Sequence, residues 1–427
     1  MHITDVLLAS GNGAFFYDDQ AAIRAGARLD GSRYQGEPQT GGFAAVRVPA
    51  ESLGIGLVLS DNTVVWGDMM SVQYSGASGR DMLFRSSLAA EVVRSAIVPR
   101  LLGCEVSSFQ RACEVAFAPY QGKRLPLAIE YGVSQAVLHA AAHCHRVTMA
   151  EILCNEYGLP KPRSRIPLFA QSGDAREINV DKMILKSADV LPHGLFNSHD
   201  KFGKDGANFR DFVRWVVKRV GELGAPGYTP VLHFDVYGWI GLEFGLDPGR
   251  IADFIAKVAD DGHGFIVNIE CPADFGSLDE QVEGYASIVR ALAQRGASAR
   301  IVVDERCNTL GDIEVFAAAN AAHLVQIKMP DVGSVADTVK GILACKKHGV
   351  GAYVGGSCTE TDLSARASVH VSVATQADMM LAKPGMGVDE ALSIVGNEQS
   401  RLFAEIQRRN PRPLPVGVER QSIEDSL

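Results

Sequence analysis

VLHFD (231–235), FIVNIE (265–270) and ARIVVD (299–304) are three short apolar runs, and each of them ends in a carboxylate. Each run has the length and the Val/Ile/Leu content of a β-strand, and helix-like segments separate one run from the next. Near-continuous apolar strands separated by helices are typical of parallel strands that are covered on both faces. These runs therefore predict an α/β fold.

Five more runs of the same kind extend this pattern in both directions: Ile166–Gln171, Val190–His193, Leu324–Lys328, Val350–Gly355 and Met379–Lys383. Together with the first three they make eight strand–helix units, which predict a (β/α)8 TIM-type barrel, a fold with a typical size of about 250 residues. The segment between the second and third strands is long enough to hold an insertion, and the helix after the first strand should be short. A doubly wound open sheet is the alternative architecture.

The first part of the chain has a different pattern. Ile55–Leu59 and Val64–Trp66 flank the turn residues Asp61 and Asn62 and predict a β-hairpin. Ser87–Leu102 and Leu127–Ala142 carry apolar residues at helical spacing. Strands followed by helices predict an α+β domain. We therefore expect an N-terminal α+β domain over residues 1–160, a barrel over 161–410 and a C-terminal tail over 411–427.

Composition narrows the class of protein. The chain has 427 residues, 47% of them hydrophobic and 21% charged, which is ordinary for a globular protein. Its net charge of −9 argues against a nucleic-acid or membrane-surface binder. No apolar run reaches membrane-spanning length, and the N-terminus lacks the basic region of a signal peptide. The eight cysteines form no CxxC pair, so we expect reduced thiols and a cytoplasmic location.

The residues at the strand ends carry the predicted chemistry, because the active sites of such barrels lie at the C-terminal ends of the strands. Asp235, Glu270 and Asp304 end three consecutive strands. Three like charges at one barrel mouth repel each other unless a cation lies among them. A site made of carboxylate oxygens suits Mg²⁺.

Two candidate bases flank these carboxylates. Gln326 and Lys328 are two residues apart on the next strand and should face into the barrel together. A divalent cation nearby disfavours the ammonium form of a lysine, so the pKa of Lys328 should fall towards the range of a general base. His193 comes from the other side of the metal cluster. This arrangement could remove a proton next to a metal-bound carboxylate.

Several other polar residues have simpler explanations. Lys383, before Pro384 and Gly385, could suggest a Schiff-base lysine, but no phosphate-binding glycine loop accompanies it. His143 and His145 are two apart on a predicted helix and face different ways, so we interpret them as structural. The pair Asp18-Asp19 is interpreted as solvated charges.

The strand-end residues and several longer motifs carry a family resemblance. Asp, Glu and Asp on consecutive strands, followed by a lysine, resemble the enolase superfamily, in which a lysine or histidine base works with Mg²⁺. The chain resembles methylaspartate ammonia-lyases, a family of that superfamily, over nearly its whole length. The motifs are FFYDDQAAIRAGA, VQYSGASGRD, QSGDAREINVDKMI, KSADVLPHGLFN, HFDVYG, VDERCNT, VQIKMPDVG, AYVGGSCTET and LAKPGMGVDE.

This resemblance implies the reversible anti elimination of ammonia from L-threo-3-methylaspartate to give mesaconate, as in glutamate degradation through mesaconate. It also implies an enolase-like capping domain, a homodimer, Mg²⁺ and activation by K⁺. Asp235, Glu270 and Asp304 would bind Mg²⁺, Lys328 would remove the C3 proton, and His193 would lie on the opposite face. The residues implied to contact the substrate or line its pocket are Gln171, Gln326, Ser357, Cys358, Gln73, Phe169, Tyr353 and Leu381.

Two positions depart from the family pattern, which has threonine at Ser357 and asparagine at Thr359. Serine keeps the hydroxyl and the backbone donor, so carboxylate binding should survive. The alternative functions are another enolase-superfamily racemase, cycloisomerase or dehydratase, and a non-catalytic binding barrel. Many of those other enzymes have a second lysine where this chain has Gln326, and this chain lacks none of the ligands or bases.

Overall fold

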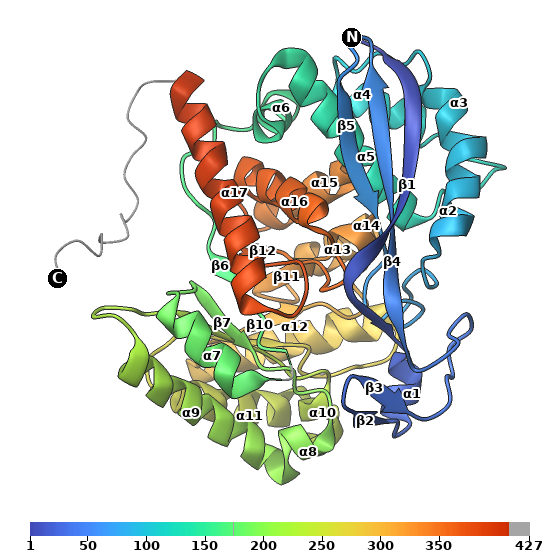
Figure 1. Ribbon diagram of the computed structural model, residues 1–427. Helices are drawn as coiled ribbons and strands as arrows, with labels where there is room; N and C mark the ends of the chain where they lie inside the picture. The colour runs from blue at the N-terminus through green and yellow to red at the C-terminus, as the bar shows by residue number, and fades with distance from the viewer. Residues whose placement is uncertain (174, 410–427) are drawn as a thin grey trace.

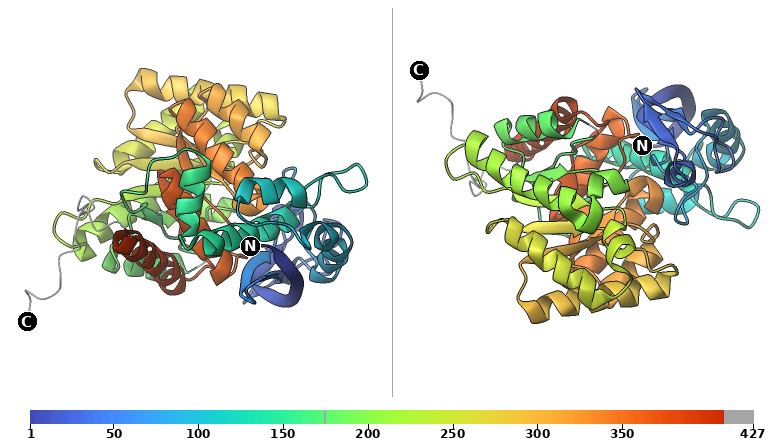
Figure 2. Two further views of the ribbon diagram at one scale, coloured as in Figure 1. Left: turned by 90° about the horizontal axis from the view of Figure 1, so that it is seen from above. Right: turned by 90° about the horizontal axis from the view of Figure 1, so that it is seen from below.

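The computed structural model describes residues 1–173 and 175–409, and the predicted tail over 411–427 lies outside the described residues. The described chain consists of an N-terminal α+β region and a barrel, which pack side by side (Figure 1). In the views from above and below, the N-terminal elements gather on one side of the barrel (Figure 2). No helix of the described residues has both the length and the apolar character needed to cross a bilayer.

The barrel confirms the predicted (β/α)8 fold and excludes the open sheet. Its strands are parallel and close in the order β10-β11-β12-β13-β6-β7-β8-β9. They cover β6 (Leu168–Phe169), β7 (Val190–His193), β8 (Val231–Asp235), β9 (Val267–Glu270), β10 (Ala299–Val303), β11 (Leu324–Ile327), β12 (Gly351–Val354) and β13 (Met379–Leu381).

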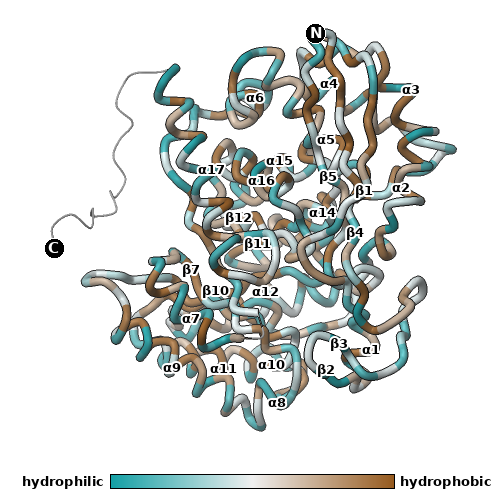
Figure 3. The backbone as a smooth tube through the Cα atoms, viewed as in Figure 1, coloured by the Kyte–Doolittle hydropathy of each residue, from teal (hydrophilic) through white to brown (hydrophobic). Residues whose placement is uncertain are grey.

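One long helix follows each strand and covers the outside of the barrel. These helices are α7 (Arg176–Leu185), α9 (Ala207–Leu223), α11 (Pro248–Asp261), α12 (Leu278–Arg295), α13 (Leu310–Ala318), α15 (Val335–Lys347), α16 (Asp362–Thr375) and α17 (Val388–Arg409). Capping boxes at Ser277, Thr309 and Thr361 begin α12, α13 and α16, because each side chain accepts a hydrogen bond from an otherwise unpaired amide of the first turn. The tube in Figure 3 is largely hydrophobic along the inner strands, while hydrophobic and hydrophilic residues alternate along the outer helices.

Four short elements precede three of the long helices, and two of the four fill the predicted insertion. They are α8 (His199–Phe202) and the 3₁₀ turn η2 (Lys204–Gly206) after β7, α10 (Trp239–Phe244) after β8, and α14 (Met329–Val332) after β11. The insertion between the second and third strands is therefore confirmed, and α8, η2 and α9 occupy it.

A three-stranded antiparallel sheet in the order β1-β4-β5 forms the N-terminal region. The predicted hairpin is confirmed as β4 (Arg47–Leu59) and β5 (Val64–Met69), whereas β1 (Ile3–Asp18) was not predicted. The remaining elements are α1 (Gln20–Arg24), β2 (Arg28–Asp30), β3 (Arg33–Gln35), α2 (Ser86–Val92), the π-helical turn η1 (Val93–Ile97), α3 (Val98–Leu101), α4 (Phe109–Ala116), α5 (Leu127–His145) and α6 (Met149–Glu156).

Helix α5 joins the two regions, because it packs on β5 on one side and on α14, α15 and α16 on the other. Most of its side chains are buried, as expected of a helix that is covered all round. Helix and sheet approach closely at two glycines. A Cβ on Gly67 would lie 2.2 Å from the carbonyl oxygen of Gly132, and one on Gly132 would lie 2.3 Å from Cγ of Met69. Larger residues at either position would push the N-terminal sheet off the helix.

Candidate active site

Five consecutive barrel strands deliver the predicted catalytic and metal-binding residues to one rim. His193, Asp235 and Glu270 are the last residues of β7, β8 and β9, and Asp304 and Lys328 directly follow β10 and β11. Asp235 and Glu270 are direct partners in the parallel ladder. The strands are neighbours in the closed barrel, so the five side chains converge at its C-terminal mouth.

The three carboxylates form a buried cluster. Asp235, Glu270 and Asp304 are at most 4% exposed. Ligand atoms of His193, Asp235 and Glu270 lie within 4.8 Å of one another, and so do those of Glu270, Cys271 and Asp304. Burial raises the pKa of Asp235 and of Glu270, and repulsion between the carboxylates raises both further. This electrostatic cost would be relieved by a cation among them, and the oxygen donors suit Mg²⁺. The buried Cys271 thiol, whose pKa burial also raises, is a soft donor that suits Mg²⁺ poorly.

Glu270 is held in place by two further side chains. Nε2 of His233 lies 2.6 Å from its Oε2, and Gln326 Nε2 donates a hydrogen bond to its Oε1 at 2.9 Å. Burial lowers the pKa of His233 to about 3, so that ring is neutral at pH 7. These contacts orient the carboxylate in the way that outer partners orient metal ligands.

Lys328 lies against the carboxylate cluster, with Nζ 2.6 Å from Oδ2 of Asp304. Burial acts to lower the pKa of Lys328, but Asp304, Glu305 and Asp331 outweigh it and the pKa is raised. The lowering that we expected from the sequence therefore does not arise from the protein groups and would have to come from a bound cation. Lys328 and Gln326 do face the same cavity, as their spacing predicts.

His193 lies on the opposite side of the cluster, with Nε2 3.6 Å from Oδ2 of Asp235. Burial lowers its pKa to about 3, and the neighbouring His233 and Lys328 contribute, so the ring is neutral at pH 7. Its Nδ1 is buried and has no hydrogen-bond partner among the described residues. His193 also adopts a left-handed backbone with φ of 70°, a conformation that costs energy outside glycine.

All but one of the predicted substrate-contacting residues line a single cavity with the charged cluster: Gln73, Gln171, Gln326, Tyr353, Ser357, Cys358 and Leu381. The exception is Phe169, which does not line this cavity. Its ring stacks on His233 at 4.3 Å between centroids and lies 5.9 Å from His193. Phe169 therefore packs against the two histidines of the site without facing the cavity itself.

Arg80 is a site residue that the sequence analysis missed. Its guanidinium is buried and lies 2.8 Å from Asp331, 3.1 Å from Glu305 and 3.6 Å from Asp304. Burial acts to raise the pKa of Glu305, but Arg80 and Lys328 outweigh it and lower the pKa to about 2. Arg80 thus brings a positive charge from the N-terminal region to the acidic rim. Its only signal in the sequence was its place in the VQYSGASGRD motif.

Tyr74, Leu195, Tyr237 and Met386 also line the cavity and were not predicted. Tyr237 follows Asp235 by two residues and, like Cys271 after Glu270 and Arg306 after Asp304, has a positive φ. Each proposed metal ligand is thus followed within two residues by a non-glycine residue in the left-handed region. Such conformations persist only where the surrounding structure holds them, and they gather at functional sites.

The interpretation of Asp18 and Asp19 as solvated charges is wrong, since both are fully buried. Asp18 accepts hydrogen bonds from Arg47 at 2.6 Å and from Gln73 Nε2 at 2.7 Å, and so positions Gln73 at the cavity. Asp19 accepts from the backbone amides that begin α1 and from Thr40.

The other polar residues behave as expected from the sequence. Lys383 is fully buried, and its Nζ donates to Glu360 and to the carbonyl of Gly355, so it is not placed as a Schiff-base lysine in the cavity. Nε2 of His143 lies 2.8 Å from Asp61, and Nε2 of His145 lies 2.7 Å from the carbonyl of Ser107, which are structural contacts.

Ser357 and Thr359, the two residues that depart from the family pattern, each form a hydrogen bond with the N-terminal region. Ser357 Oγ accepts a hydrogen bond from the amide of Gln73 at 2.9 Å, and Thr359 Oγ1 donates to the carbonyl of Ser71 at 2.7 Å. The amide of Ser357 donates to Glu360 at 2.9 Å, so the backbone donor that we expected to bind the substrate is already used. The hydroxyl hydrogen is therefore the donor that Ser357 has left for a carboxylate.

Comparison with known proteins gives this site its context. The family description "Methylaspartate ammonia-lyase N-terminus" matches residues 1–158, and "Methylaspartate ammonia-lyase C-terminus" matches residues 162–408. The chain belongs to the methylaspartate ammonia-lyase family. It is therefore an ammonia-lyase, which is a carbon–nitrogen lyase.

Individual relatives support this family membership. Methylaspartate ammonia-lyase 1 of Carboxydothermus hydrogenoformans is 46% identical over 96% of this chain and 98% of its own length. The magnesium complex of β-methylaspartase from Clostridium tetanomorphum is 43% identical, covers 96% of this chain and 100% of its own, and superposes with a TM-score of 0.91. The Citrobacter amalonaticus enzyme containing (2S,3S)-3-methylaspartic acid is 44% identical, covers 95% and 100%, and gives a TM-score of 0.93.

More distant structures share the fold alone. A muconate lactonizing enzyme from Pseudomonas fluorescens is 16% identical, covers 92% of this chain and 88% of its own, and superposes with a TM-score of 0.60. This likeness shows a shared fold and carries no argument for the reaction of that enzyme here.

Proposed function

We propose that this ammonia-lyase catalyses the reversible, Mg²⁺-dependent anti elimination of ammonia from L-threo-3-methylaspartate to give mesaconate. The observation that carries the proposal is the convergence of Asp235, Glu270, Asp304 and Lys328 on one cavity in a chain of this family. The (2S,3S)-3-methylaspartic acid and magnesium complexes of relatives support the choice of substrate and metal.

Asp235, Glu270 and Asp304 would hold Mg²⁺, which when bound would stabilise the negative charge that develops on a substrate carboxylate. The donor set fits this ion, because all three groups offer hard oxygens and repulsion among them raises the pKa of Asp235 and of Glu270. Gln326 and His233 keep Glu270 oriented towards the cavity.

Lys328 would act as the base for the C3 proton, and ammonia would leave from C2 on the opposite face as the C2–C3 double bond forms. A lysine accepts a proton only as the free amine. Asp304, which raises the pKa of Lys328, is also a proposed metal ligand. When the charge of Asp304 is compensated, the pKa of Lys328 falls towards the range of a general base. His193, neutral and on the other side of the cluster, would serve the epimeric substrate.

The remaining side chains would bind and orient the substrate. Gln73, Gln171 and the hydroxyl of Ser357 supply hydrogen-bonding groups, and Cys358 lies beside Gln73 with Sγ donating to its Oε1 at 3.3 Å. Tyr353 and Leu381 form the apolar wall, and Phe169 packs beneath them. K⁺ activation and homodimer assembly remain predictions from the family resemblance, to be tested by initial rates with K⁺ and by sedimentation. A cytoplasmic location remains a prediction from the cysteine content.

The test is ammonia release, together with ultraviolet absorbance of the unsaturated diacid, from 3-methylaspartate with and without Mg²⁺. Asp235→Ala, Glu270→Ala and Asp304→Ala should each abolish turnover, because two carboxylates hold the ion poorly. Each variant should also lose the rise in thermal stability that Mg²⁺ gives the wild type. The metal-free stability of Asp235→Ala and Glu270→Ala should not fall through electrostatics, because repulsion is relieved, whereas Asp304→Ala leaves the buried Lys328 without its partner and should be less stable. Asp253→Ala, at an exposed ion pair with Arg295 on the outer surface, is the control. Wild-type turnover in all three variants would refute the metal assignment.

A further inference from the structure

The loop over residues 355–360, between β12 and α16, carries Ser357 and Cys358 to the cavity and surrounds a buried ion pair. The pair is formed by Lys383, which follows β13, and Glu360, with Nζ 2.7 Å from Oε2. Both side chains are fully buried and neither lines the cavity. The proposed reaction uses neither group, so their presence requires another explanation.

The ion pair holds both ends of the loop. Lys383 Nζ also donates to the carbonyl of Gly355 at 3.0 Å, and Glu360 Oε2 also accepts from the amide of Ser357 at 2.9 Å. The loop wraps tightly around these groups. A Cβ on Gly356 would lie 2.1 Å from Glu360 Oε2 and 2.3 Å from Lys383 Nζ. The backbone path of the loop is thus set by the ion pair.

The N-terminal region supplies a third member of this network. Tyr131 on α5 is fully buried, and its hydroxyl donates to Glu360 Oε1 at 2.5 Å. Glu360 therefore accepts from Lys383, Ser357 and Tyr131. The same loop touches the N-terminal region again through Gln73 and Ser71, which pair with Ser357 and Thr359. The position of the loop is consequently tied to both regions of the molecule.

We propose that Lys383, Glu360 and Tyr131 are positioning residues that hold the 355–360 loop so that the Ser357 hydroxyl and Cys358 meet a carboxylate of the substrate. This proposal rests on the proposed function, which places Ser357 and Cys358 at the substrate. The backbone amide of Ser357 donates to Glu360, and Oγ of Ser357 accepts a hydrogen bond from the backbone amide of Gln73. The hydroxyl hydrogen is therefore the donor that Ser357 has left for the substrate.

The chemistry of the pair agrees with positioning. A buried ion pair contributes little net stability compared with apolar side chains of the same shape, although removal of one partner is costly. Burial lowers the pKa of Lys383, and the attraction of Glu360 opposes this. Lys383 therefore depends on Glu360 to keep the charge with which it holds Gly355.

The test is the effect of Tyr131→Phe and Lys383→Met on steady-state kinetics with 3-methylaspartate and saturating Mg²⁺. Each variant removes a hydrogen bond to a charged group, and we expect KM to rise about 10-fold. Since the loop should bind ground state and transition state alike, kcat should stay within about 2-fold. Ser357→Ala should raise KM too, and combining it with Tyr131→Phe should add little, because both changes act through the same hydroxyl.

Tyr228→Phe is the matched control, since that hydroxyl donates to the carbonyl of Ala188 just before β7, at the opposite end of the barrel. It should alter stability but not KM. A Tyr131→Phe enzyme with lowered thermal stability and unchanged KM would overturn the proposal, as would additive effects with Ser357→Ala. If Lys383→Met fails to fold, Tyr131→Phe, which removes a single oxygen atom, still decides the question.

Hydrogen exchange separates this proposal from the proposed function. The peptide over residues 355–361 should exchange faster in Tyr131→Phe than in wild type and Tyr228→Phe, whatever substrate the enzyme uses. Wild-type protein that does not release ammonia from 3-methylaspartate would refute the proposed function, and unchanged exchange in this peptide would refute the positioning role.

Discussion

The two candidate bases differ in the charges that surround them. Lys328 lies among Asp304, Glu305 and Asp331, which raise its pKa, whereas His193 is a neutral ring whose pKa burial lowers to about 3. The carboxylate cluster lies between them. A substrate bound there presents one face to each base, so the two side chains are expected to act on different diastereomers.

Lys328→Ala should therefore reduce deamination of the threo substrate by about 10²–10⁴-fold, the usual contribution of a positioned general base. His193→Ala should impair the erythro substrate most, since its C3 proton points to the other side. The measurement is kcat for each diastereomer in each variant, with Lys340→Ala on the exposed face of α15 as the control. Equal losses on both substrates in each variant would contradict the two-sided arrangement.

Leu381 is a second residue whose role can be separated by experiment. It is 1% exposed and packs inside the barrel with Phe169, Tyr353 and Met379, yet it also lines the cavity. Leu381→Ala should admit larger 3-alkyl substituents. The change in the kcat/KM ratio should be modest, because a matched methylene in an apolar pocket contributes about 1–3 kcal/mol. The substitution should also lower the free energy of unfolding by about 2–5 kcal/mol. The measurement is the kcat/KM ratio for larger 3-alkyl against 3-methylaspartates.

Met379→Ala controls for the loss of packing, because Met379 is two residues earlier on β13, in the same inner cluster, but does not line the cavity. It should destabilise the protein without changing the substrate ratio. If Leu381→Ala behaved in the same way as Met379→Ala, Leu381 would be a core residue only and the substituent pocket would lie elsewhere.

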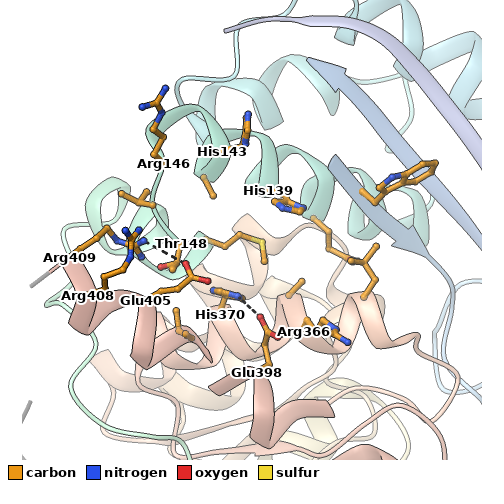
Figure 4. Close-up of a pocket in the computed structure, with 18 residues that line it drawn as sticks. His139, His143, Arg146, Thr148, Arg366, His370, Glu398, Glu405, Arg408 and Arg409 are labelled. Atoms are coloured by element: carbon orange, nitrogen blue, oxygen red, sulfur yellow. Dashed lines mark hydrogen bonds and ion pairs between the residues drawn. The ribbon is translucent and has the colours of Figure 1, made fainter. Parts of the chain in front are cut away.

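At the scale of elements, the carboxylate of Glu398 links the last helix, α17, to its neighbour α16 through ion pairs. Glu398 on α17 lies 3.2 Å from Nε2 of His370 and 3.5 Å from Arg366, both on α16 (Figure 4). It also lies 2.7 Å from Arg401 on its own helix. Glu398, His370 and Arg366 belong to the wall of a cavity of about 510 Å³ between α5, α16 and α17. Burial acts to raise the pKa of Glu398, but hydrogen bonds from His370 and Arg401 outweigh it and lower the pKa to about 2.

A carboxyl with a lowered pKa stabilises the folded state above its unfolded pKa of about 4.3, and this stabilisation is lost as the pH falls towards about 2. Glu398→Gln should therefore lower the free energy of unfolding by about 1 kcal/mol at pH 7, given the partial exposure of the ion pairs. The difference from wild type should shrink as the pH falls. Urea unfolding across this pH range measures it.

Glu405→Gln on the same helix is the control, because Glu405 is largely exposed and lies 3.6 Å from Arg409. Its effect on the free energy of unfolding should be smaller and nearly independent of pH. A Glu398→Gln difference that stayed constant throughout the acid range would contradict the assignment of this stabilisation to the carboxylate.

Much of the barrel and its rim could be predicted because their signals are local. Each strand is a continuous apolar run, and Asp235, Glu270, Asp304 and Lys328 stand where such runs end. Strand β1 could not be predicted, because half of its residues are exposed and Gly11 and Gly13 interrupt its alternation. The burial of Asp18 depends on Arg47 and Gln73, which are distant in the sequence and belong to no repeating pattern.

At the scale of the whole molecule, Arg80 links the N-terminal region to the barrel. Its acidic partners, Asp304, Glu305 and Asp331, are more than 220 residues away in the sequence, which explains why no local pattern indicated it. Gln73, Tyr74 and Tyr131 cross the same boundary. The cavity is therefore a product of both regions.

Arg80→Ala should lower the free energy of unfolding by about 3–5 kcal/mol, because it leaves buried carboxylates without their partner. Chemical denaturation of wild type and variant measures this. Arg85→Ala is the control. Arg85 forms an ion pair with Glu51 at 2.9 Å, but both side chains are about a third exposed, and this pair should contribute less than about 1 kcal/mol. Equal effects of the two substitutions would show that Arg80 is not the link described here.

The hydrogen bond between the Gln73 amide and Ser357 Oγ spans 284 positions of the chain. A ribosome adds roughly 5–20 residues per second, so on the order of tens of seconds pass between the synthesis of one partner and that of the other. During that interval the part of the N-terminal region that contacts the 355–360 loop has no loop to contact. Catalysis therefore requires that synthesis has passed this loop, and a fragment that ends before residue 355 cannot perform it.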